Sequence, residues 1–261
     1  MPSAKEIEFS AKMKALMAEV DHLQDGAVKR LLSILNQARR EVAADVASTD
    51  WEAYRLKTLK EAIERALTEF ADKYSIDLRT TQADLFDLGV SRASIPFGVA
   101  TTMTMAPSIN IKALEIAQDY SSDLISNLAR DAIKKINHEL TLGILGQKTP
   151  FEVMTAIGRN LEDPSVFKSI ASRAEVITRT ETGRIFEMAT QSRLQDAERL
   201  VPGLKKQWLS SPMRPTARPE HHTAEVDGQV RRIDEPYIVA GEELMFPGDP
   251  AGSAWNTINC G

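Results

Sequence analysis

The residues with the clearest potential for chemistry lie in the last third of the chain and are of types that bind metals. His221, His222 and Cys260 carry imidazole and thiol groups, and Asp227 or Asp249 would add a carboxylate. Imidazole and thiolate suit zinc, but structural zinc sites normally use closely spaced ligand pairs, and this spacing is irregular. The competing interpretation is that these side chains hydrogen-bond turns and carboxylates in a small module. We therefore expect no metal and no cofactor.

A second candidate group is charged and lies on a predicted helix. Arg179, Glu181 and Arg184 are spaced so that they face one another in part, and they could orient a substrate carboxylate or phosphate. A buried or interfacial ion-pair network is the preferred interpretation, because buried charges are generally paired. No nucleophile with a neighbouring base and no phosphate-binding glycine loop is present, so we expect no enzyme and no catalytic residues.

The N-terminal part of the chain has the apolar spacing of amphipathic helices. From Ala4 to about Asp77, apolar residues recur at steps of three and four, which predicts a helical hairpin or bundle of three helices. Breaks are expected at Asp25-Gly26 and at Ser48-Thr49-Asp50. The second break supplies a side-chain cap for a helix that starts at Trp51.

The stretch from Ala93 to Ile111 interrupts this spacing. It contains Pro96 and Pro107 among β-branched residues, which favours an extended or looped backbone. We interpret it as a partly buried linker or, alternatively, as a docking segment for a neighbouring subunit. Further helices are expected over 112–142, from Thr149-Pro150 onward, and over 164–198.

Prolines and glycines become frequent after Val201-Pro202-Gly203, with short predicted strands at 206–209, 229–233 and 237–239. The sequence therefore predicts an α+β protein, with a mainly α-helical N-terminal two thirds and a small β-rich or irregular C-terminal module. The predicted regions are 1–111, which ends in the linker, then 112–200 and 201–261.

Charge and composition narrow the function classes. The net charge is −5, and the segment 205–235 holds six basic residues against five acidic ones, too small an excess for a DNA-binding surface. Trp208 and Trp255 are therefore expected to be core anchors and not base-stacking platforms. The single cysteine, Cys260, excludes an intrachain disulfide and fits a reducing compartment. No apolar stretch is long enough to predict a membrane span.

Four segments of the C-terminal half occur in a distinctive order. They are ELTLGILGQKTPFEVMTAI (139–157), RAEVITRTETGRIFEMAT (173–190), KKQWLSSPMRPTARPEHHTAEVDGQ (205–229) and ELMFPGDPAGSAWNTINC (243–260). This run, from about 140 to 261, resembles the phage Mu F-like minor head, or head morphogenesis, protein family. The positions that match the family pattern are Arg179, Thr180, Glu181, Trp208, Arg218, His221, Asp227, Gly228, Pro247, Gly248, Asp249, Pro250, Ile258, Asn259 and Cys260. The family continues beyond this cysteine with an arginine and a second cysteine, where this chain has Gly261.

The resemblance implies a structural protein of the phage virion, a minor head protein at the portal vertex. Its expected roles are head morphogenesis, DNA packaging or genome ejection. Its expected partners are the portal protein, the major capsid or scaffolding protein, further copies of itself and packaged DNA, with no membrane. It is expected in the virion, in the head interior or at the portal vertex, and in the host cytoplasm during assembly.

Two other functions stay open at this stage. One is a DNA-binding protein that is packaged and ejected with the genome. The other is a nucleic-acid or nucleotide-processing enzyme that uses the C-terminal module, with Arg179, Glu181, Arg218 and His221 as its site.

Overall fold

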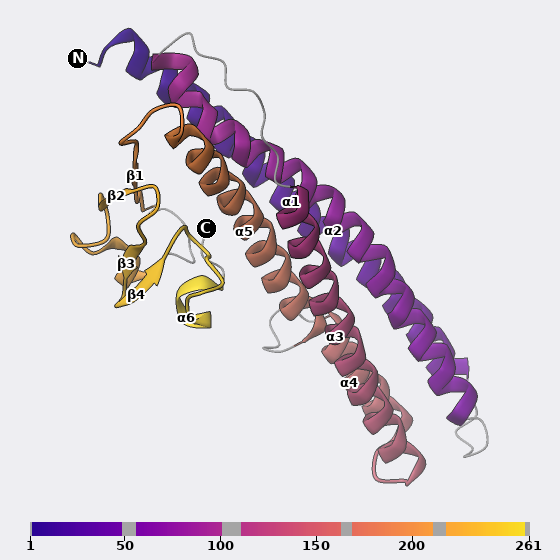
Figure 1. The fold of residues 1–261 in the computed structure, drawn as a ribbon. Coiled ribbons are helices and arrows are strands. Elements are labelled where there is room, and N and C mark those ends of the chain that lie inside the picture. Colours follow the sequence, from indigo (N-terminus) through magenta and orange to yellow (C-terminus); the bar gives the residue numbers. More distant parts are fainter. Residues whose placement is uncertain (1, 49–55, 101–110, 163–168, 211–217, 259–261) are drawn as a thin grey trace. The chain divides into compact units, whose positions relative to one another are not determined.

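The computed structural model describes residues 2–48, 56–100, 111–162, 169–210 and 218–258 (Figure 1). The chain forms two compact units, each assembled from separate parts of the sequence. Unit 1 comprises 1–24, 81–117 and 179–261, and unit 2 comprises 25–80 and 118–178. The fold is α+β and mainly helical, as predicted.

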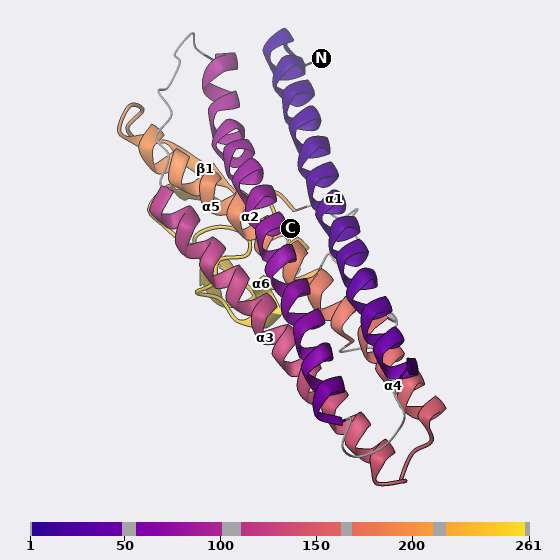
Figure 2. The ribbon, with the colours of Figure 1, turned by 90° about the vertical axis from the view of Figure 1, so that its right-hand side faces the viewer.

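Long helices make up most of the described chain (Figures 1 and 2). Their bounds are α1 (Ala4–Ser48), α2 (Leu56–Ala100), α3 (Ile111–Ile144), α4 (Pro150–Glu162) and α5 (Ile170–Glu198). The helices predicted over 112–142 and from residue 150 are confirmed. The predicted helix over 164–198 is confirmed from residue 170 on, and its start lies outside the described residues.

The predicted break at Asp25-Gly26 is wrong, because α1 runs through it without interruption. A glycine inside a helix costs only about 1 kcal/mol relative to alanine. The neighbouring Ala27, Val28 and Leu31 are buried, and burying such side chains outweighs that penalty. The described part of 4–77 therefore contains two helices and not three. The predicted start at Trp51 lies outside the described residues.

The predicted extended stretch from Ala93 is also wrong over 93–100, where α2 continues as a helix with Pro96 inside it. Proline removes one helical hydrogen bond at a cost of about 3 kcal/mol. Around it, Ala93 is buried and Ile95 packs against an apolar cluster of unit 1, so tertiary packing keeps the helix intact. The remainder of that stretch, with Pro107, lies outside the described residues as far as residue 110.

Unit 2 has a continuous apolar core. Leu31, Leu67, Leu128, Val153 and Ala174 are all buried in this one cluster and come from five different helices. No helix in the described residues is both long enough and apolar enough to cross a membrane.

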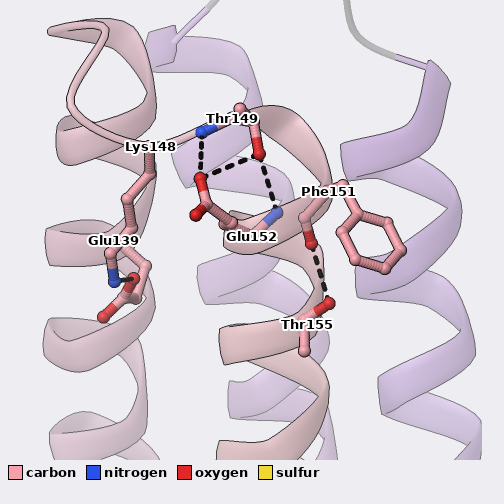
Figure 3. A network of polar contacts seen from close by, with 6 residues as sticks. All are labelled: Glu139, Lys148, Thr149, Phe151, Glu152 and Thr155. Atoms are coloured by element: carbon pink, nitrogen blue, oxygen red, sulfur yellow. Dashed lines mark hydrogen bonds and ion pairs between the residues drawn. The ribbon is translucent and has the colours of Figure 1, made fainter.

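Helix α4 begins with a reciprocal capping arrangement (Figure 3). The Thr149 amide donates to Glu152 Oε2 over 2.8 Å, and the Glu152 amide donates to Thr149 Oγ1 over 3.3 Å. These hydrogen bonds satisfy amides that a helix start leaves unpaired, and they lower the pKa of Glu152. Lys148 is paired with Glu139 of α3, so the turn that joins the two helices is held at both ends.

The C-terminal module belongs to unit 1 and contains two small antiparallel sheets. Strand β1 (Lys205–Gln207) pairs with β2 (Val230–Arg232), and β3 (Tyr237–Val239) pairs with β4 (Glu242–Leu244). The 3-10 helix η2 (Pro219–His222) and the short helix α6 (Ala254–Thr257) complete the described part. The three predicted strands are confirmed to within two residues, and β4 was not predicted.

Candidate functional site

The charged group predicted on α5 is a buried ion pair that also holds the C-terminal module. Arg184 Nη1 lies 2.6 Å from Glu181 Oε1, and the two side chains are 12% and 4% exposed. Arg184 Nε also donates to the carbonyl of Gly248 over 2.9 Å. Burial raises the pKa of Glu181, and Arg184 opposes that rise. The preferred interpretation as a buried ion pair is confirmed for Glu181 and Arg184. The Gly248 carbonyl accepts a further hydrogen bond from the same arginine.

A second buried polar contact joins α5 to the module about two helical turns further along, on the same face of the helix. Gln191 donates its amide to the carbonyl of Ile233 over 2.8 Å and accepts a hydrogen bond from Lys206 Nζ over 3.3 Å. Lys206 also donates to the carbonyl of Met245 over 2.8 Å and lies over the Tyr237 ring, 4.9 Å from its centroid. One glutamine thus contacts both β1 and the turn that follows β2.

Lys206 is 5% exposed, and burial lowers its pKa to about 8. A lowered pKa means that the folded state disfavours the charged amine, so the unfolded state binds more protons between pH 8 and the ordinary lysine pKa of about 10.5. We expect the free energy of unfolding to rise across that window by roughly 3 kcal/mol, at 1.36 kcal/mol per pKa unit. In Lys206→Met this rise should disappear.

The measurement is urea unfolding followed by tryptophan fluorescence at pH 7, 8, 9 and 10. The matched control is Lys205→Met, the exposed lysine next to it in the same strand, which should keep the wild-type rise. A rise in Lys206→Met equal to that of the wild type would contradict the assignment to Lys206.

Trp208 anchors the core of the module, as predicted. It is 5% exposed and makes edge-to-face contacts with His221 at 6.0 Å and with Tyr237 at 5.3 Å between ring centroids. Its carbonyl accepts a hydrogen bond from the amide of Gly228, where φ is +80° and glycine is therefore favoured. His221 Nε2 pairs with Asn256 Oδ1 at 3.3 Å, and burial lowers the pKa of this histidine.

The prediction that Trp255 is a core anchor is wrong, because this side chain is 66% exposed. It lies on the four-residue helix α6, which is too short to bury both faces. Arg218 stacks over its ring at 5.7 Å and donates to the carbonyl of Ile258. Arg218 and His221 therefore tie α6 to η2.

The Pro-Gly-Asp-Pro segment is a turn organised by Asp249. The carboxylate accepts hydrogen bonds from the amides of Met245 and Ala251 over 2.8 and 2.9 Å. Gly248, at φ +76°, presents its carbonyl to Arg184, and Pro247 precedes it. The segment thus gives α5 one of its contacts with the module.

The candidate metal ligands are not brought together in the described part of the chain. No group of three or more His, Cys, Asp or Glu side chains that could hold an ion occurs among those residues. Asp227 accepts the amide of Ser210, and Asp249 organises its own turn. Asn259 and Cys260 lie outside the described residues.

The remaining predicted positions lie on the same stretch of α5. Thr180 is buried and Arg179 is half-buried, and both make contacts within the fold. Three further residues were not predicted: Gln191 and Asn256, which bridge separate elements, and Gly89 of α2, where an added Cβ would lie 2.3 Å from the carbonyl oxygen of Phe186 on α5. Gly89 carried a weak signal, because a glycine inside a helix costs about 1 kcal/mol relative to alanine and can therefore have a packing reason.

The site and the fold define a mainly helical α+β protein with a small module tied to one helix by buried polar contacts. In comparisons with known proteins, no family model matches the chain, and no curated protein or solved structure matches it either.

Proposed function

We propose that this chain is a non-catalytic assembly protein of a phage virion, a minor head protein that acts at the portal vertex. The observation that carries the proposal is the ordered set of four segments over 139–260, which resembles the phage Mu F-like family. Contacts between the later segments add support. Arg184, from the second segment, binds Gly248 of the fourth, and Trp208 and His221 of the third pack together with Asn256 of the fourth nearby.

The same contacts favour a structural role over an enzymatic one. Glu181 is neutralised by Arg184, His221 is buried against Trp208, and Arg218 lies over Trp255. Arg184, His221 and Arg218 each connect two elements of the fold, and Glu181 compensates the charge of Arg184, as a scaffold for protein contacts requires.

We assign the portal-binding surface to the first of the four segments, residues 139–157. Leu145, Phe151 and Met154, called here the apolar tip, are 64%, 77% and 40% exposed. The capping hydrogen bonds at Thr149 and the Lys148–Glu139 pair hold this turn in place (Figure 3). Exposed apolar side chains on a rigid frame bind a protein partner with little loss of conformational entropy.

The test is a pull-down of tagged protein from cells infected with the phage that encodes it, with bound proteins identified by mass spectrometry. We expect the portal or major capsid protein with the wild type, and at least a fivefold lower recovery with Phe151→Ser. The matched control is Ile76→Ser, an equally simple change at an exposed apolar residue of the same unit, 69% exposed, which should bind as the wild type does.

Two outcomes would count against the proposal. Recovery of only DNA, with an affinity that falls steeply with salt, would favour the genome-ejected DNA-binding protein. Recovery of portal protein by Phe151→Ser at the wild-type level would keep the function but remove the apolar tip from the interface.

A further inference from the structure

The C-terminal module has an apolar core of its own. Its buried cluster consists of Trp208, Val226, Tyr237, Val239 and Leu244, and all five belong to the module. The apolar residues of α5 in unit 1 pack elsewhere: Phe186 lies in a cluster with residues of α1 and α2, and Ile185 lies in another with Phe86. The module core is therefore separate from the helical clusters of unit 1.

The described side-chain hydrogen bonds between α5 and the module are called here the seam. Each of them joins a donor to an uncharged acceptor. Arg184 donates to the Gly248 carbonyl, Gln191 donates to the Ile233 carbonyl, and Lys206 donates to the Gln191 side chain. Interfaces of this polar kind between parts of one chain permit relative motion, whereas large apolar interfaces do not.

The buried charges beside the seam, Arg184 and Lys206, are each compensated by carboxylates on their own side. On the helix, Arg184 is paired with Glu181. On the module, the carboxylates that act on Lys206 are Asp249, Asp234 and Glu235, all of them module residues. Across the seam, Glu198 of α5 acts on Arg232 of the module, but the Arg232 side chain is 61% exposed, so separating these two charges costs little.

The other groups around Lys206 also belong to the module, except for one neutral side chain of α5. Arg231 is its partner across the β1–β2 ladder, and the Tyr237 ring lies against its amine. From α5, the contacting group is the neutral side chain of Gln191. The connection between helix and strand is a short turn, in which Gly203 has φ +83° and the amide of Leu204 donates to the carbonyl of Val201.

We propose that the C-terminal module is a detachable unit that leaves and rejoins helix α5 as a folded body, by breaking the seam at Arg184, Gln191 and Lys206. This inference does not rest on the proposed function. Detachment exposes a helical face and a module face that are covered in the docked state, so a partner that binds either face would shift the equilibrium toward the open form.

The test uses two adjacent lysines of the full-length chain as reporters. Lys205 is exposed and Lys206 is buried against the seam, so a brief pulse of acetic anhydride at pH 7.5 should acetylate the first and spare the second. Peptide mass spectrometry gives the ratio of acetylation at the two positions. We expect Arg184→Gln, which weakens the seam, to raise the Lys206 to Lys205 ratio at least fivefold. Arg199→Gln, which removes an exposed ion pair with Asp196, should leave the ratio unchanged.

Hydrogen exchange of the β3 and β4 amides separates detachment from unfolding. If the module leaves as a folded body, these amides keep their protection in Arg184→Gln while Lys206 becomes reactive. Loss of β3–β4 protection in parallel with Lys206 labelling would show that the module unfolds instead, and would overturn the proposal. An unchanged labelling ratio in both Arg184→Gln and Gln191→Ala would overturn it as well.

Discussion

Gly89→Ala is expected to destabilise the protein by about 3 kcal/mol, the range of severe overpacking of a close-packed interior. A methyl group at this position would lie 2.3 Å from the carbonyl oxygen of Phe186 and 2.8 Å from Cβ of Ala189. The first neighbour is backbone, so it cannot move aside as a side chain would. The hydrogen bond from Thr190 Oγ1 to the Gly89 carbonyl would be strained at the same time.

Urea unfolding followed by circular dichroism measures this effect, and the chain offers a matched control. Gly98 lies in the same helix, and a methyl group there would meet no atom within 4 Å. Gly98→Ala should be neutral or stabilise slightly, by up to about 1 kcal/mol, because alanine has the higher helix propensity. Equal unfolding midpoints for the two variants would show that α2 and α5 do not approach closely at Gly89.

Arg184→Met is expected to destabilise the protein by a similar amount, about 3 kcal/mol, the lower end of what breaking a buried ion pair costs. The change leaves Glu181, whose side chain is 4% exposed, without its cation, and leaves the Gly248 carbonyl without its donor. Methionine fills much of the same volume, so the loss reports on charge and hydrogen bonding more than on packing.

The pH dependence of this variant has a defined sign. Burial already raises the pKa of Glu181, and loss of Arg184 removes the group that opposes the rise. An acid with a raised folded-state pKa stabilises the fold at low pH and loses that contribution as the pH rises through its folded-state pKa. The deficit of Arg184→Met relative to the wild type should therefore shrink between pH 7 and pH 5.

The control for this variant is Arg199→Met, at the residue directly after α5. Arg199 is paired with Asp196 at the same three-residue spacing, but its side chain is 81% exposed. Exposed pairs contribute about 0–1 kcal/mol, so this variant should unfold within about 1 kcal/mol of the wild type. A deficit as large as that of Arg184→Met would mean that burial does not distinguish the two pairs.

The helices could be predicted from apolar spacing, but their continuity could not. Gly26 and Pro96 are the usual signals for a helix end, and both lie inside helices. The penalties of a glycine and a proline are about 1 and 3 kcal/mol, and a few buried neighbours offset them. Strand β4 was missed because Glu242 and Glu243 have low strand propensity. The positive φ values of Ala240 and Gly241 form the tight turn that pairs it with β3.

The site was predictable in its local contacts and not in its long-range ones. The spacing of Glu181 and Arg184 along one helix predicts their pairing, whereas nothing local indicates that Gly248 lies against them. Lysines are rarely buried, so nothing in the sequence indicated that Lys206 would be covered. Trp255 was predicted to lie in the core, because large aromatic side chains are usually covered.

The pairing of strands in the C-terminal module has a consequence for the order in which it forms. Strands β3 and β4 are neighbours in sequence and need only a short loop to close, whereas β1 and β2 are separated by more than twenty residues. The cost of closing the longer loop makes the β1–β2 sheet the slower of the two sheets to form. The hydrogen bond between His221 and Asn256 also forms late, because Asn256 comes after all four strands in the sequence. During synthesis the helices can therefore assemble first, and the residues of the C-terminal module reach their final arrangement last.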